Sequence, residues 1–201
     1  MKKIIVGITG ATGVIYGIRL LEVLRDLEIE SHVVISEAAK QNIVIETDFS
    51  VDEVEKFAYR LYEPKNLAAS ISSGSFKTDG MVIVPCTIKT LSGIANSYND
   101  NLITRAADVV LKEKRRLILV ARETPLHKGH LQLMSQAADL GAVILPPVPA
   151  FYHGPETIQD LIDHIVGKIL DLMDVEHNLF RRWNGPPSDE ITERRIGAGR
   201  T

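Results

Sequence analysis

The sequence contains little cysteine, few aromatic residues and no long apolar segment. Cys86 is the only cysteine among 201 residues, which excludes an internal disulfide and is typical of a protein in a reducing cytoplasm. Aromatic residues make up 5% of the chain and the formal net charge is −3, so neither base stacking nor a positive field favours nucleic acid. No apolar run approaches the ~20 residues that a membrane-spanning helix requires. We therefore expect a cytoplasmic protein that binds neither nucleic acid nor a membrane.

The order of the apolar segments predicts an α/β fold. Continuously apolar, β-branched segments alternate with segments whose apolar residues recur at helical spacing. We predict strands over 3–9, 31–35, 81–84, 117–121 and 142–145, the third of them ended by Pro85. We predict helices over 14–27, 37–46, 52–62, 87–95, 102–114, 126–140 and 158–172. Such alternation indicates a mostly parallel sheet with helices on both faces.

The C-terminal end of the sequence has a different character. After Trp183 the apolar period is lost, and Pro186-Pro187 is followed by two glycines, Gly197 and Gly199. We therefore expect a single domain over 1–183 and an exposed or disordered tail over 184–201.

A glycine-rich turn follows the first predicted strand. Its spacing, Gly7-x-x-Gly10-x-x-Gly13, lies between a strand and a helix, where glycines let the backbone approach a phosphate. The helix N-terminus adds N–H groups and partial positive charge, and Thr12 adds a hydroxyl donor. Short-chain dehydrogenases share this pattern but also need a downstream Tyr-x-x-x-Lys pair, which this sequence lacks. Glycines that serve only a tight turn remain the alternative.

Two further strand ends carry polar side chains. The segment Cys86–Thr90 supplies two threonine hydroxyls after the third predicted strand, and Arg122-Glu123 follows the fourth. In an open α/β sheet, residues just past the carboxyl ends of the strands face the ligand crevice. Thr87 is a candidate phosphate contact or a plain helix N-cap. Arg122 is a candidate anion clamp or a surface salt-bridge residue, and Glu123 a candidate acid/base or a helix-start carboxylate.

Cysteine and histidine chemistry is less favoured. No base stands near Cys86 in the sequence, so a buried, apolar role is a better interpretation than a nucleophile. His127 and His130 share a helical face with Glu123 one turn earlier, but they lack the glutamate-between-histidines arrangement of a zinc protease. We therefore expect no metal site.

Taken together, these segments resemble the flavin prenyltransferase family (UbiX-type), long described as subunits of phenolic-acid or hydroxybenzoate decarboxylases. The resemblance extends from the first strand to Trp183, and the combination of motifs is specific although no single glycine motif is. The matching segments are Gly7–Gly13, Ser72-Ser73-Gly74-Ser75-Phe76, Pro85–Thr90, Arg122–Leu126 and Gly141–Tyr152.

The resemblance implies a flavodoxin-like Rossmann domain that binds FMN and assembles as a homododecamer, with active sites at subunit interfaces. Family members transfer a dimethylallyl group from dimethylallyl monophosphate to N5 and C6 of reduced FMN. The prenylated FMN then serves a separate UbiD-type aromatic acid decarboxylase. The positions that match FMN contacts are Gly10, Ala11, Thr12, Ser36, Thr87, Ile88, Lys89, Thr90 and Arg122. Those that match contacts to the prenyl phosphate are Tyr152 and Lys168, and those of the charged catalytic cluster are Lys112, Glu123 and Glu46.

This resemblance fits metal-independent chemistry. The sequence has no Asp-Asp-x-x-Asp cluster to hold magnesium, so cationic side chains must stabilise the departing phosphate. Lys112, Arg122 and Lys168 can supply that charge, and Glu123 can carry protons. Two positions depart from many members: Thr12 replaces a serine, and Lys168 replaces an arginine. A lysine offers a point charge in place of a bidentate fork.

Two other functions share the same fold and flavin. One is an FMN-dependent cysteine decarboxylase, and the other is a non-catalytic FMN-carrying subunit of a decarboxylase. The Arg-Glu-Thr-Pro segment at 122–125 and the Pro-Pro-x-Pro-x-Phe-Tyr segment at 146–152 favour the prenyltransferase over the cysteine decarboxylase.

Overall fold

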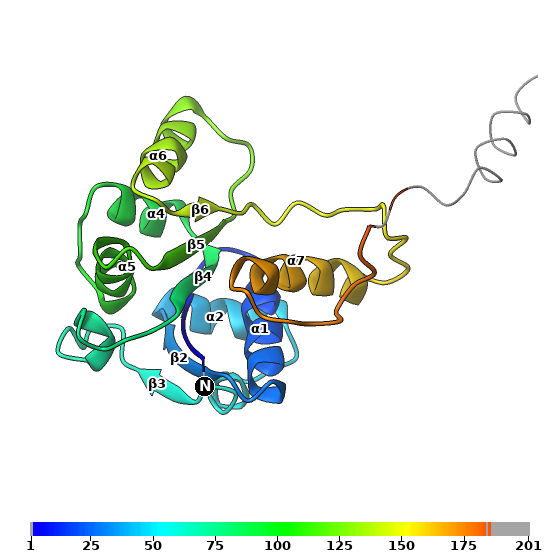
Figure 1. Cartoon of the computed structure of the whole chain (residues 1–201), viewed down its shortest axis with the longest axis horizontal. Helices are drawn as coiled ribbons and strands as arrows, with labels where there is room; N and C mark the ends of the chain where they lie inside the picture. Colours follow the sequence, from blue (N-terminus) through cyan, green and yellow to red (C-terminus); the bar gives the residue numbers. More distant parts are fainter. Residues whose placement is uncertain (1, 184, 186–201) are drawn as a thin grey trace, which may run out of the picture.

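A six-stranded parallel sheet forms the centre of the computed structural model, which describes residues 2–183 and 185 (Figure 1). The strand order is β3-β2-β1-β4-β5-β6, and every neighbouring pair is parallel. The strands are β1 (Lys3–Ile8), β2 (Glu30–Ile35), β3 (Arg60–Tyr62), β4 (Gly80–Cys86), β5 (Arg116–Ala121) and β6 (Val143–Ile144). The predicted α/β fold is confirmed, whereas the predicted tail lies outside the described residues except for residue 185.

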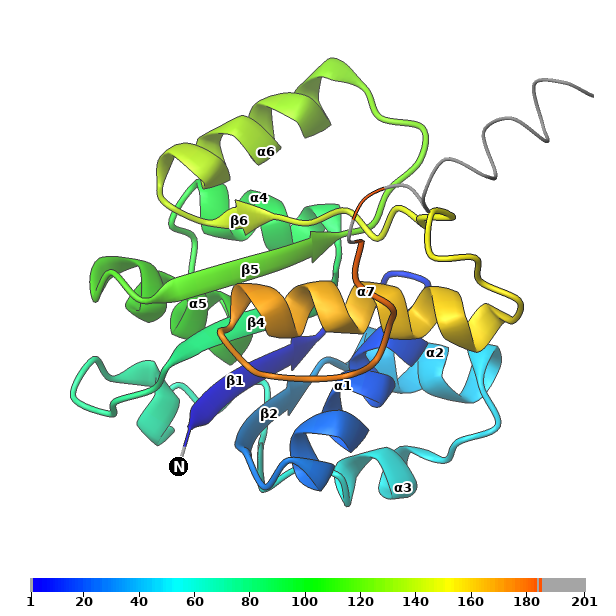
Figure 2. The ribbon, with the colours of Figure 1, turned by 45° about the vertical axis from the view of Figure 1, so that its right-hand side comes forward.

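Helices connect the strands and cover both faces of the sheet. They are α1 (Val14–Asp26), α2 (Glu37–Glu46), α3 (Val51–Glu55), α4 (Ile88–Ala95), α5 (Leu102–Lys112), α6 (Lys128–Asp139) and α7 (Ile158–Leu172), with a 3-10 turn at Ser70–Ser72. Figure 2 shows α1 and α7 on one face and α4 and α5 on the other. Within the described ranges, no helix is both long and apolar enough to cross a bilayer.

Alternate residues of the central strands enter two separate cores. In β1, Ile4 and Val6 pack with α1 and α7, whereas Ile5 packs on the opposite face. The same period of two holds in β4 and β5, where the alternating residues are Met81, Val82, Ile83, Val84, Leu117, Ile118, Leu119 and Val120. A parallel strand covered on both faces must be apolar at every position, which explains the continuous apolar runs in the sequence.

The segment 52–62, predicted as one helix, forms the short helix α3 and the edge strand β3. Ser50 and Glu53 make a capping box, in which the Glu53 carboxylate accepts from the Ser50 N–H at 2.8 Å. The chain then turns into β3, which pairs with β2. There Tyr62 is buried, and its hydroxyl lies 2.9 Å from His32 Nδ1. This tertiary contact overrides the local helical spacing.

Two other predicted boundaries differ from the structure. Strand β4 continues through Pro85 to Cys86, with an irregular register against β5 at this end. A proline lacks the N–H of a regular ladder and is tolerated where the ladder is irregular. The helix predicted from 126 begins at Lys128, because the His127 side chain caps it. The remaining predicted elements lie within two residues of their predicted bounds.

The strand order places the ends of β1, β4 and β5 side by side. Because all strands are parallel, their carboxyl ends meet at one edge of the sheet, which we call the carboxyl edge. The chain order reverses direction between β1 and β4, and such a switch point is where open α/β sheets bind ligands.

Helix α1 packs directly on β4 at Gly17. A Cβ atom at this position would lie 2.6 Å from the Val84 carbonyl oxygen. We expect Gly17→Ala to lower the free energy of unfolding by about 1–3 kcal/mol, because overpacking outweighs the gain in helix propensity. Urea unfolding followed by circular dichroism measures the change. The exposed Ser135→Ala on α6 is the control, and an undiminished midpoint for Gly17→Ala would contradict this packing.

Candidate functional site

The side chain of Thr9 joins the ends of β1 and β4. Its hydroxyl donates to the Pro85 carbonyl oxygen at 2.7 Å and accepts from the Thr87 N–H at 2.9 Å. Thr9 is only 3% exposed, so water does not compete for these bonds. The glycine turn after β1 is therefore held beside the N-terminus of α4.

The glycine turn depends on two of its glycines. A Cβ atom at Gly10 would lie 2.4 Å from the Cβ of Ala38, so the first turn of α2 could not approach the loop so closely. Gly13 has a φ of +94°, a left-handed conformation that favours glycine. The turn therefore presents backbone without side chains at the carboxyl edge.

Glu46 reaches the glycine turn from the end of α2. Its carboxylate accepts from the Gly13 N–H at 2.7 Å and from the Val14 N–H at 3.3 Å. A negative charge at a helix N-terminus is stabilised by the helix dipole. The structure thus places the predicted catalytic Glu46 next to the predicted flavin-binding turn, on the first N–H groups of α1.

Three other helices begin at the carboxyl edge with a side-chain cap. Ser36 caps α2, Thr87 caps α4 and Asn101 caps α5, accepting from backbone N–H groups at 3.2, 3.1 and 2.9 Å. Thr87 Oγ1 also lies 3.0 Å from Thr90 Oγ1. Each helix directs partial positive charge toward its N-terminus, so this edge favours an anion.

A cavity of about 960 Å³, which we call the carboxyl-edge cavity, lies among these helix N-termini. Its volume is at the upper end of the range of small-molecule sites, roughly 300–1,000 Å³. The predicted FMN positions that line it are Gly10, Ser36, Thr87, Lys89 and Thr90. Hydroxyls, a lysine and positive helix ends suit a ligand that carries phosphate.

The other predicted FMN positions lie around this cavity. Ala11 and Thr12 belong to the glycine turn, and Ile88 borders a second cavity on the far side of α4. The Arg122 N–H donates to the Cys86 carbonyl oxygen at 3.1 Å, so the loop after β5 is fixed to the end of β4. Glu123 follows as an exposed carboxylate at the same edge.

The sequence interpretation missed several residues that line the carboxyl-edge cavity. They include Lys65, Asn101 and Thr104. Asn101 is a common helix-capping residue, and α5 must run antiparallel to the strands it connects. Together these two signals could have placed the start of α5 at the ligand edge.

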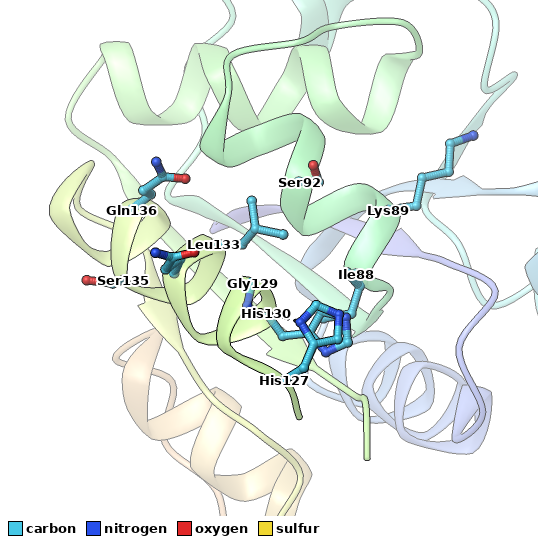
Figure 3. A pocket seen from close by; sticks show the side chains of 10 residues that line it. Ile88, Lys89, Ser92, His127, Gly129, His130, Leu133, Ser135 and Gln136 are labelled. Carbon is cyan, nitrogen blue, oxygen red and sulfur yellow. Dashed lines mark hydrogen bonds between the residues drawn. The ribbon is translucent and has the colours of Figure 1, made fainter. Parts of the chain in front are cut away.

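A second cavity of about 700 Å³ lies between α4 and α6 (Figure 3). Lys89 and Ser92 border both cavities, and Figure 3 shows the Lys89 side chain directed away from the histidines. The rings of His127 and His130 lie with centroids 3.6 Å apart and are tilted by 34° to each other. His127 Nδ1 accepts from the Gly129 N–H at 3.0 Å. No group of three or more His, Cys, Asp or Glu in the part of the chain described here is arranged to hold a metal.

The two residues predicted to contact the prenyl phosphate are both close in the structure to His164 of α7. The Tyr152 hydroxyl is 3.1 Å from Nε2 of His164, and Lys168 follows one turn later on the helix. Lys168 Nζ lies 3.6 Å from a carboxylate oxygen of Asp171. Neither Tyr152 nor Lys168 lines the carboxyl-edge cavity of the same chain.

Known proteins are similar to this chain over most of its length. The family model for flavoproteins matches residues 1–170. The flavin prenyltransferase UbiX of Escherichia coli K12 is 60% identical over 188 residues, which cover 92% of this chain and 100% of that protein. The chain belongs to the UbiX-type flavin prenyltransferase family.

Solved structures of UbiX-type proteins have the same fold. AnUbiX (PadA1), solved with FMN and dimethylallyl pyrophosphate, has a TM-score of 0.91 and 49% identity, covering 92% of this chain and 99% of that chain. A dodecameric FMN-dependent UbiX-like decarboxylase from Escherichia coli O157:H7 has a TM-score of 0.89 and 49% identity, covering 91% and 100%. The predicted flavodoxin-like Rossmann fold is confirmed. Peptidyl-cysteine decarboxylase EpiD, at 16% identity and a TM-score of 0.62, shares the fold alone.

One charged position of the UbiX-type cluster lies apart from the others within this subunit. Lys112 ends α5, an eleven-residue helix about 16 Å long that begins at the carboxyl-edge cavity. It forms an ion pair with Glu113 beside Gly74, at the opposite edge of the sheet. Within one chain, α5 thus separates Lys112 from Glu46 and Glu123, and its place in the catalytic cluster stays a prediction.

Cys86 is a buried thiol at the end of β4. Burial raises its pKa to about 12, so it remains protonated at pH 8 and is not a nucleophile there. Because thiol reagents attack the thiolate, we expect less than about 0.1 reactive thiol per native chain and about one after denaturation. Absorbance after adding Ellman's reagent at pH 8, with and without guanidinium, tests this. Rapid stoichiometric labelling of the native protein would contradict the buried state.

Proposed function

We propose that this protein transfers a dimethylallyl group from dimethylallyl monophosphate to reduced FMN. The carboxyl-edge cavity carries the proposal, because three capped helix N-termini and the matching FMN positions converge there. The 60% identity to a flavin prenyltransferase and the likeness to a structure with FMN and dimethylallyl pyrophosphate support it. The product would serve a UbiD-type aromatic acid decarboxylase, and the single free cysteine supports a cytoplasmic location.

The residues of the carboxyl-edge cavity fit an FMN molecule. Hydroxyls of Ser36, Thr87 and Thr90, with the N–H groups of α2 and α4, form a donor set for its phosphate. Lys89 adds positive charge at the wall, and Arg122 stands at the neighbouring strand end. Reduced FMN supplies the nucleophilic N5 and C6 atoms that take the dimethylallyl group.

Departure of the prenyl phosphate requires positive charge and hydrogen-bond donors. The Tyr152 hydroxyl, which lies against His164 of α7, and the Lys168 ammonium one turn later on this helix can provide both. Lys112 and Arg122 supply further charge in the same role. Preorganised cations of this kind replace the magnesium that other prenyl transferases use, so we propose a metal-independent reaction.

Two carboxylates have distinct places at the site. Glu123 is exposed at the end of β5, where it can take up and release a proton during ring closure. Glu46 accepts two N–H bonds at the start of α1 and so stays next to the glycine turn. We propose Glu123 as the proton carrier and Glu46 as a fixed negative charge beside the flavin.

We propose that each active site is completed by neighbouring copies in a homododecamer. Lys112 and the Tyr152–Lys168 pair do not line the carboxyl-edge cavity of their own chain. Large apolar side chains are exposed on several elements, as expected of interface surfaces: Val44 (65%), Ile45 (77%), Leu131 (54%), Phe151 (68%) and Ile158 (78%). A related UbiX-like protein is dodecameric.

Mass spectrometry of the released flavin tests the proposed reaction. We expect FMN to gain one C5H8 unit after anaerobic incubation with the protein, a reductant and dimethylallyl monophosphate in the presence of EDTA. Incubations without protein, or with heat-denatured protein, are the controls.

Unmodified FMN from folded, flavin-loaded protein would contradict prenyl transfer. Decarboxylation of a cysteine peptide in a parallel incubation would then favour the cysteine decarboxylase. Activation of an apo-decarboxylase by flavin that the protein carries but does not modify would favour the carrier.

A complementation experiment tests the source of Lys112. We expect Lys112→Ala and Glu46→Gln to be inactive alone. Mixed oligomers from coexpression should regain roughly a quarter of wild-type activity, because random assembly pairs an intact Lys112 with an intact Glu46 in about one site in four. Coexpression of two differently tagged Lys112→Ala chains is the control. Failure of the mixed oligomers to regain activity would indicate that both residues act within one chain.

A further inference from the structure

His164 occupies the middle of α7, beneath the residue proposed to contact the prenyl phosphate. It is 6% exposed, and its Nε2 lies 3.1 Å from the Tyr152 hydroxyl oxygen. Lys168 stands one turn later, so the imidazole and the ammonium share a helical face. The proposed mechanism assigns no role to His164, although the Tyr152 hydroxyl is hydrogen-bonded to this histidine.

Aromatic rings hold the imidazole of His164 in place. The ring of His153 stacks on it with centroids 4.8 Å apart and an interplanar angle of 8°. The Phe180 ring lies at 4.8 Å from the imidazole, and the Trp183 ring packs on Tyr152 at 5.9 Å. Figure 2 shows the chain after α7 returning along this helix. The ring contacts place Phe180 and Trp183 of that segment in the cluster. The buried imidazole of His164 is thus enclosed by the rings of His153 and Phe180.

The two nitrogens of His164 differ in what surrounds them. Nε2 faces the Tyr152 oxygen, whereas Nδ1 is buried without a hydrogen-bond partner within residues 2–183 and 185. A buried N–H donor without an acceptor is rarer and costlier than a buried nitrogen lone pair. We therefore assign the proton of the neutral ring to Nε2, from the hydrogen-bond network.

This tautomer decides what the tyrosine hydroxyl can do. Nε2–H donates to the Tyr152 oxygen, so the Tyr152 O–H is not used by the histidine and remains free to donate outward. With the proton on Nδ1, the tyrosine would donate to Nε2 and would offer a phosphate only lone pairs. A phosphate oxygen accepts hydrogen bonds, so only the first arrangement suits an anionic substrate.

The surroundings of His164 keep it neutral. Burial lowers the pKa of its imidazole, and the charges of His153 and Lys168 lower it further, whereas the carboxylate of Asp171 raises it. Arg182 donates a hydrogen bond to the Asp171 carboxylate at 2.7 Å, and its positive charge reduces the effect of Asp171 on the pKa of His164. These surroundings favour the neutral imidazole.

We propose that His164 is a positioning residue that fixes the Tyr152 hydroxyl with its proton free for the departing phosphate. This role rests on the proposed function, because it requires Tyr152 to contact the phosphate of dimethylallyl monophosphate. His164 touches neither substrate nor flavin and acts only through the hydroxyl oxygen of Tyr152.

Single variants at His164 and Tyr152, and one double variant, test the proposal. His164→Phe keeps a ring of similar area but removes the donor, and His164→Gln restores an amide N–H near the position of Nε2. We expect His164→Phe to raise KM for dimethylallyl monophosphate roughly 3- to 10-fold with little change in kcat, since one neutral hydrogen bond is lost. His164→Gln should stay within about twofold of the wild type.

The double variant separates positioning from a structural role. In the Tyr152→Phe background, where no hydroxyl remains to be positioned, His164→Phe should add nothing to the rise in KM. Flavin affinity, measured by quenching of FMN fluorescence, should be unchanged in all variants. If His164→Phe loses flavin binding, His164→Gln is compared with His164→Asn, whose shorter amide places no donor at Nε2.

The results distinguish the possible failures. The positioning role would be overturned if His164→Phe raised KM equally in the wild-type and Tyr152→Phe backgrounds. It would also be overturned if His164→Gln raised KM as much as His164→Phe. If His164→Phe has a normal KM and Tyr152→Phe a raised KM, the positioning role is overturned, whereas the contact of Tyr152 with the phosphate is not. A normal KM for Tyr152→Phe would show that the proposed contact of Tyr152 is wrong, and absence of prenylated flavin from the wild type would remove the proposed function itself.

Discussion

Two hydrogen bonds at the Thr9 hydroxyl hold the ends of β1 and β4 together, and the ligand edge is organised around them. One bond fixes the Pro85 carbonyl oxygen and the other fixes the Thr87 N–H, so the glycine turn and the start of α4 cannot separate. Because all strands are parallel, each connecting helix returns along the sheet and the next strand ends at the same edge. Charge, hydroxyls and bare backbone are thus gathered from segments that are distant in the sequence, such as those of Gly10, Ser36 and Thr87.

The sequence predicted most of the fold because the physics of buried strands is local. A strand covered on both faces is continuously apolar, so β1, β4 and β5 could be recognised in the sequence as apolar segments. The edge strand β3 was not, because its position depends on pairing with β2 and on the buried contact between Tyr62 and His32. Likewise, no local sequence pattern predicts that β4 continues through Pro85 to Cys86.

The sequence predicted fewer of the contacts at the candidate site than of the elements of the fold. Strand ends pointed to Thr87 and Arg122, because the carboxyl ends of parallel strands must meet at one edge. The bond between His164 and Tyr152 was invisible, since it joins a loop to the middle of a helix through rings that pack only in three dimensions. The distance of Lys112 from the carboxyl-edge cavity of its own chain depends on the length of α5, which a local motif does not show.

The carboxylate of Glu46 on the first N–H groups of α1 has a consequence for how this glycine turn works. In many nucleotide-binding folds that helix end receives the phosphate of the ligand. Here the protein's own negative charge occupies it, and the N-termini that face the cavity belong to α2, α4 and α5. The glycine turn therefore offers the cavity backbone at Gly10, beside a carboxylate that already occupies the start of α1. In the proposed function, the flavin ring would lie beside this turn and its phosphate would lie at the N-termini of α2 and α4.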